Sequence, residues 1–135
     1  MNEGGEKNYH PLLVVLVNDQ SQLEYDRSKP LSAQQMRSLD HMDQKMDAGI
    51  RLGSDWVENP DPMQRAKFVA VNLIEALQQN SEGLVAASCA YLANRLPALK
   101  QVKAKLLGGG FSVELVFDKP YVKETTVDFI PRSSS

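Results

Sequence analysis

An uninterrupted run of apolar residues, Leu12–Val17, constrains the fold more than any other feature of this chain. Pro11 precedes the run and a polar cluster, 18–21, follows it. Its short length and its Leu and Val content favour a strand over a helix. Because the run does not alternate, we expect both of its faces to be covered, one by helices and the other by a candidate partner. Leu23 and Tyr25 then alternate with polar residues, which predicts an N-terminal β-hairpin.

The same run is too short for a membrane segment. It has six residues, whereas a transmembrane helix needs about 20 and the apolar part of a signal peptide about 7–15. The 135-residue chain has one cysteine, Cys89, which excludes an internal disulfide. With a net charge of -2, the chain lacks the strong electrostatic field of a dedicated nucleic-acid or membrane-surface binder. We therefore expect a cytoplasmic protein with no membrane association, no cofactor and little affinity for nucleic acid.

The first of three segments with helical periodicity begins after Ser32. Ser32 and Gln35 form a capping box, and Gly49 supplies a left-handed stop after about Ala48. At about 100° per residue, one face of this helix is apolar. Its members are Met36, Leu39, Met42, Met46 and Ile50.

Two further helices follow a predicted loop, Arg51–Pro60. Asp61 and Pro62 begin the second helix, which ends near Gln79–Asn80. Ser81 caps the third, which continues to about Leu96 and is apolar on nearly every side. A helix of that kind belongs in the interior, so we expect it to be the central helix.

The chain returns to strand periodicity over 101–106 and 111–117, with three glycines, 108–110, as the turn between them. Lys103 or Lys105 is expected to pair with Glu114 across this second hairpin.

The predicted fold is therefore α+β: an N-terminal β-hairpin, three α-helices and a C-terminal β-hairpin, in a mostly antiparallel sheet packed on the helices. Three helices separate the hairpins, which leaves parallel pairing between them open. We expect one domain over 1–135, with flexible ends at 1–10 and 131–135 and a candidate edge strand at Thr125–Ile130.

A row of carboxylates on the first helix is the main polar candidate. Asp40, Asp43 and Asp47 are three and four residues apart, so a hard cation could bridge two of them. The alternative is a solvated acidic edge, with Asp47 paired to Arg51. His41 points about 100° away from Asp40 and does not join the row.

The other reactive residue types give weaker patterns. Cys89 lies in an apolar helix and is expected to be an inert core thiol. The glycines 108–110 lack the Lys-Ser/Thr of a phosphate-binding loop. Lys100, Lys103 and Lys105 form a small basic face without an aromatic side chain on which bases could stack.

Apolar residues where polar ones are expected give the best functional signal. Phe68 and Val71 lie on the otherwise polar side of the second helix, and Trp56 and Val57 interrupt a polar loop. Clustered aromatic residues anchor interfaces. Burial of the same residues beneath the sheet is the alternative.

We accordingly expect a non-catalytic protein-interaction module, a homodimer or a binder of another protein, using these four residues. The alternative function is a metal-dependent enzyme or metal binder built on Asp40, Asp43 and Asp47.

Overall fold

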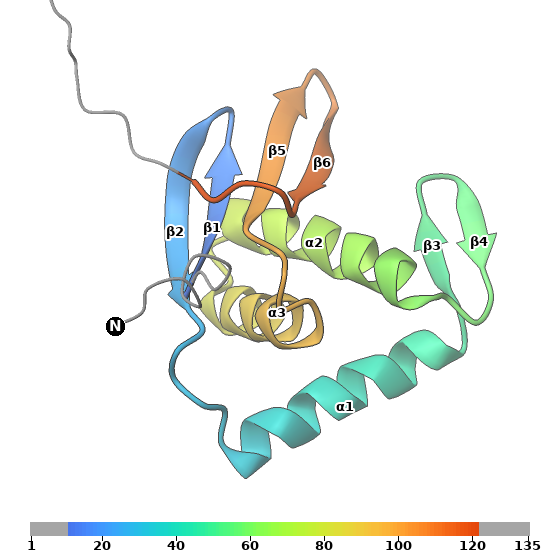
Figure 1. The fold of residues 1–135 in the computed structure, drawn as a ribbon. Coiled ribbons are helices and arrows are strands. Elements are labelled where there is room, and N and C mark those ends of the chain that lie inside the picture. The colour runs from blue at the N-terminus through green and yellow to red at the C-terminus, as the bar shows by residue number, and fades with distance from the viewer. Residues whose placement is uncertain (1–10, 122–135) are drawn as a thin grey trace, which may run out of the picture.

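The computed structural model describes residues 11–121 of the chain. They form three helices and six strands in an α+β arrangement, with a strand hairpin at each end (Figure 1). In chain order the elements are β1 (Leu12–Val17), β2 (Gln20–Asp26), α1 (Ala33–Asp47), β3 (Ile50–Leu52), β4 (Asp55–Val57), α2 (Pro62–Gln78), α3 (Glu82–Arg95), β5 (Gln101–Leu107) and β6 (Gly110–Val116). The predicted edge strand Thr125–Ile130 and the predicted flexible ends lie outside the described residues.

The two terminal hairpins share one sheet with the strand order β2-β1-β5-β6. Both hairpins are antiparallel, and β1 and β5 join them in parallel, with Val14 opposite Gln101. The prediction of two hairpins meeting in one mostly antiparallel sheet is confirmed. The chain crosses from β1 and β2 to β5 through all three helices, which makes the parallel pairing feasible.

Both hairpin turns use left-handed backbone. Asn18 and Asp19 have φ of 50° and 67° in the first turn, and Gly109 has φ of 85° in the second. Asparagine, aspartate and glycine tolerate this region better than other residues. The Asn18 side chain also accepts a hydrogen bond from the Leu106 N–H (2.9 Å), which ties the first turn to β5.

The apolar core lies between one face of the sheet and the helices α2 and α3. Its members include Leu13 and Val102 from the strands and Leu73, Ile74 and Leu92 from the helices. On the opposite face of β1, Val14 and Leu16 are also buried, as the absence of alternation predicts. The chain after β6 turns back across β5, where the Gln101 side-chain amide donates to the Lys119 carbonyl (3.0 Å) (Figure 1).

Helix α1 forms a third layer below α2 and α3 (Figure 1). Its capping box, Ser32 with Gln35, is formed as predicted. Gly49, with φ of 126°, follows the helix, so Ile50 belongs to β3 and not to the helical apolar face. The predicted loop after it contains a second, two-stranded sheet, β3 with β4.

The two remaining helices differ in how they begin. Asp61 and Gln64 form a capping box on α2, with Pro62 in its first turn. Ser81 makes no side-chain cap on α3, and Leu84 in its first turn is exposed. The prediction that α3 is apolar and interior all round is therefore wrong for its first turn, and its buried stretch starts at Ser88.

Candidate functional site

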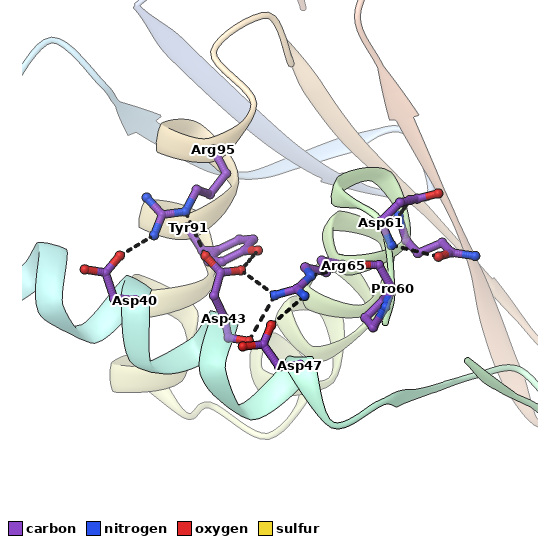
Figure 2. Close-up of polar contacts among 9 residues, drawn as sticks. Asp40, Asp43, Asp47, Pro60, Asp61, Arg65, Tyr91 and Arg95 are labelled. Carbon is purple, nitrogen blue, oxygen red and sulfur yellow. Dashed lines mark hydrogen bonds and ion pairs between the residues drawn. The ribbon is translucent and has the colours of Figure 1, made fainter. Parts of the chain in front are cut away.

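The acidic row of α1 lies along the edge of the helix that meets α2 and α3, with Asp43 shielded and Asp40 and Asp47 largely exposed. Asp43, the middle carboxylate, accepts hydrogen bonds from the Tyr91 hydroxyl (2.5 Å), from Arg95 Nε (3.1 Å) and from Arg65 Nη1 (3.2 Å) (Figure 2). Its side chain is 28% exposed. One carboxylate thus joins α1 to α2, through Arg65, and to α3, through Tyr91 and Arg95.

The flanking carboxylates extend the same cluster. Asp47 pairs with Arg65 Nη2 at 2.7 Å, and Asp40 pairs with Arg95 Nη2 at 2.9 Å (Figure 2). The predicted pairing of Asp47 with Arg51 is wrong, because Arg65 approaches from another helix and Arg51 lies over the Trp56 ring. We call these six residues the α1 cluster: Asp40, Asp43, Asp47, Arg65, Tyr91 and Arg95.

Arg65 connects three segments of the chain through its hydrogen bonds. Besides the two carboxylates, it donates to the Asp43 carbonyl (2.9 Å) and, through Nε, to the Pro60 carbonyl (3.0 Å). It therefore fixes α1, α2 and the chain entering α2 relative to one another. Sequence reasoning missed this residue, and the signal available was a charged side chain next to the core position Ala66.

The electrostatics of the α1 cluster favour its charged form. Burial raises the pKa of Asp43, but hydrogen bonds from Tyr91, Arg95 and Arg65 outweigh it, and the net effect is a lowered pKa. Burial and the bond to Asp43 raise the pKa of Tyr91. The hydrogen bond to Asp47 raises the pKa of Arg65. Asp43 is thus held as an anion and Tyr91 as a neutral donor.

This arrangement is suited to holding helices together. A general acid or base must exchange a proton near the working pH, whereas Asp43 and Tyr91 have pKa values that move away from neutrality. Over residues 11–121, no group of three His, Cys, Asp or Glu side chains is placed to hold a metal ion. The metal-binding alternative stays a prediction, and a cation at Asp43 would have to displace two guanidinium groups.

The two other chemically versatile residues lie elsewhere. His41 is exposed beside a hollow of about 510 Å³ between α1 and α3, lined also by Arg37 and Met42. Cys89 is buried, and burial raises the pKa of its thiol to about 12. Since the thiolate is the nucleophile, this supports the expectation of an unreactive core thiol.

The basic residues of the late hairpin are turned toward the first hairpin. Asp19, in the β1–β2 turn, lies 3.7 Å from Lys105 and 4.0 Å from Lys103. Lys103 stands opposite Glu114 in the ladder, but the ion pairs found for both lysines in the described part of the chain are with Asp19. The expected cross-strand pair with Glu114 is replaced because the parallel β1–β5 contact brings Asp19 close.

The four candidate interface residues do not form one exposed patch. Val57 and Phe68 are half-buried and pack against the core, and Val71 is half-buried as well. The second side of α2 is not free, since α2 contacts β6 as well as α3. Trp56 alone is largely exposed, at 55%.

Trp56 has a defined position on the small hairpin. It stands opposite Arg51, whose guanidinium carbon is 5.9 Å from the ring centroid. The ring also lies against Gly49, where an added Cβ would come within 2.5 Å of Cζ2. On the other face of the hairpin, Ile50 and Val57 belong to or pack on the core. The indole is thus held on the outward face by the backbone beneath it.

Of the helices in residues 11–121, none is both long and apolar enough to cross a membrane. The chain matches no protein-family model, and neither a curated protein nor a solved structure shows significant similarity to it.

Proposed function

We propose that this protein is a non-catalytic interaction module that associates with itself, and that Trp56 is part of its contact surface. The observation that carries the proposal is the 55% exposure of the indole on the outward face of β3–β4.

The residues around Trp56 support this use of the surface. Tryptophan and arginine are the side chains that most often dominate binding energy at protein interfaces, and Arg51 lies over the ring. Met63, in the first turn of the adjoining α2, is a further exposed apolar side chain. Because Gly49 supports the indole, little side-chain freedom remains to be lost on binding.

The polar chemistry of the described residues supports a binding role over a catalytic one. The carboxylates with the most hydrogen bonds are paired with arginines, and the one thiol is buried with a raised pKa. An enzyme would be expected to present converging titratable groups in a concave site.

Sedimentation equilibrium over a range of protein concentrations tests the proposal. We expect reversible association of the full chain, and a concentration-dependent shift in the fluorescence of Trp56, the single tryptophan. Trp56→Ala should weaken the association by about tenfold or more. The matched control is Leu84→Ala, which removes an exposed apolar side chain from α3.

A monomer at every concentration, with unchanged Trp56 emission, would contradict self-association. Equal effects of Trp56→Ala and Leu84→Ala would remove Trp56 from the contact surface.

A further inference from the structure

The outer edge of β6 is open over the described residues. β6 ends the strand order β2-β1-β5-β6, and no strand in 11–121 pairs with its outer side. Its seven residues pair with β5 without a register shift, contain no proline and include one charged residue, Glu114. Natural sheets usually protect such an edge with lysine, proline or a bulge, because its unpaired backbone groups bind other strands.

The opposite edge of the sheet has that protection. The β1–β2 ladder contains a register shift between Val15 and Leu16, which disturbs the strand geometry. β2 itself carries Glu24 and Asp26 as well as exposed polar residues at its start. The difference singles out β6 as the edge at which another strand can add.

The turn of the second hairpin fixes which backbone groups of β6 point outward. Leu107 pairs with Gly110 across a two-residue turn, and the closing pair of such a hairpin is hydrogen-bonded. By alternation, Ser112 and Glu114 bond to β5. Phe111, Val113 and Leu115 direct their backbone N–H and C=O groups to the open edge. Their side chains are half-buried and pack on the core cluster.

We infer that the edge of β6 is taken by β6 of a second copy of this chain, antiparallel, about a two-fold axis at Val113. The inference rests on the self-association proposed above and names its surface. In this register all seven residues of β6 face a residue of the other β6, and Val113 faces its own counterpart.

The side chains of β6 are self-complementary in this register. Phe111 of each copy lies opposite Leu115 of the other, an aromatic–aliphatic pair on the helix-covered face. Ser112 lies opposite Glu114 on the other face, so the carboxylates do not meet. Moving the axis to Glu114 would place the two glutamates opposite each other, and moving it to Ser112 would leave fewer residues paired.

The Trp56 surface lies on the same side of the molecule. β6 and the β3–β4 hairpin both contact α2, and β6 is the strand of the main sheet nearest to that hairpin (Figure 1). A second copy at the β6 edge therefore lies on the side of the sheet nearer to the β3–β4 hairpin. One contact region can include both the strand edge and the indole.

Val113→Pro tests the edge directly. Because the Val113 N–H points outward, proline removes an edge donor without removing a bond to β5. We expect the dissociation constant of the dimer to rise by at least about tenfold. The circular dichroism spectrum should remain that of the folded chain. Amide hydrogen exchange of the wild type gives a second readout. The N–H groups of Phe111, Val113 and Leu115 should become protected as protein concentration rises.

Two substitutions at Ser112 test the register. The glutamate of Ser112→Glu faces Lys105 within its own chain, and this attraction favours the fold. In the symmetric dimer it also faces Glu114 of the second copy, and this repulsion occurs at two places. It should weaken the dimer, and Ser112→Lys should tighten it, each by about threefold to tenfold at low salt. Both effects should shrink in about 0.5 M salt.

The outcomes separate this inference from the proposed function. A wild type that stays monomeric overturns both. A wild-type dimer that is weakened by Trp56→Ala, but not by Val113→Pro or Ser112→Glu, overturns the β6 contact and leaves the interaction module standing. A folded Val113→Pro variant that remains dimeric, together with unprotected edge amides in the wild type, would also overturn the β6 contact and leave the interaction module standing.

Discussion

Helix α1 is held in the fold by different forces from those that hold the pair α2–α3. Six residues of α2 are buried, whereas α1 buries only Leu39 and Met46. Met36 and Met42 add partly buried apolar contacts, and the polar attachment of α1 runs through the carboxylates of the α1 cluster and their arginine and tyrosine partners. Apolar burial holds under most conditions, but ion pairs depend on pH and salt. The third layer should therefore open separately from the other two.

The largest effect is expected from damage to the apolar layers. Leu73, on α2, is fully buried in the core. Leu73→Ala removes its side-chain contacts and leaves a cavity, which should lower the free energy of unfolding by about 2–5 kcal/mol. Urea denaturation followed by circular dichroism measures this, and the sheet, α2 and α3 should lose stability together. Leu84→Ala, at an exposed site, is the control, expected within about 0.5 kcal/mol of wild type. Equal losses for the two variants would contradict the assignment of the core.

Among substitutions that affect only the third layer, Asp43→Ala should cause the largest loss of stability. It leaves Tyr91 and parts of two arginines without their acceptor, which should cost about 2–3 kcal/mol. Hydrogen exchange should show faster opening of α1 amides, with α2 and α3 retaining protection. Glu75→Ala, an exposed carboxylate on α2, is the control. Uniform loss of protection in all three helices would mean that α1 does not open separately.

The carboxylate row was visible in the sequence, but its partners were not. Helical spacing places Asp40, Asp43 and Asp47 on one face, and it cannot say what that face meets. Arg65 lies 18 residues from Asp47 and Arg95 lies 55 residues from Asp40. Such pairs depend on how the layers stack, whereas local spacing offers only basic residues close in sequence, such as Arg51 for Asp47.

Elements governed by local rules were predicted well. The capping box at Ser32, the helix start at Asp61 and Pro62, and the glycine turn after Leu107 depend on neighbours within a few residues. The β3–β4 hairpin was missed because strands of three residues are too short to show alternation. The sequence also grouped Trp56 with Phe68 as one apolar surface. The structure separates them, since α2 turns Phe68 toward the core.

Acid should weaken the third layer before the other two. The pKa of Asp43 is lowered in the folded protein from the ordinary value of 3.8. A lowered folded-state pKa adds stability that is complete above the ordinary value and is lost as pH falls through the lowered one. Protection of α1 amides should therefore fall below about pH 4. The loss should be smaller than that in Asp43→Ala, because protonation is partial.

Asp43→Asn separates this titration from those of other carboxylates. The difference in unfolding free energy between wild type and Asp43→Asn should shrink as pH falls from 5 toward about 3. A difference that stays constant over this range would show that the Asp43 charge does not stabilise the fold.

The smallest effect is expected at the exposed end of the same row. Asp40 is 65% exposed, and its one ion pair within residues 11–121 is with Arg95, which keeps its second bond to Asp43. Asp40→Asn should therefore change the unfolding free energy by less than about 1 kcal/mol, and about 0.5 M salt should abolish the change. Urea denaturation at low and high salt measures both. A loss comparable to that of Asp43→Ala would mean that the carboxylates act as one unit, with Asp40 orienting Arg95. The weak attachment of α1 would then depend on the whole row and not on its one shielded member.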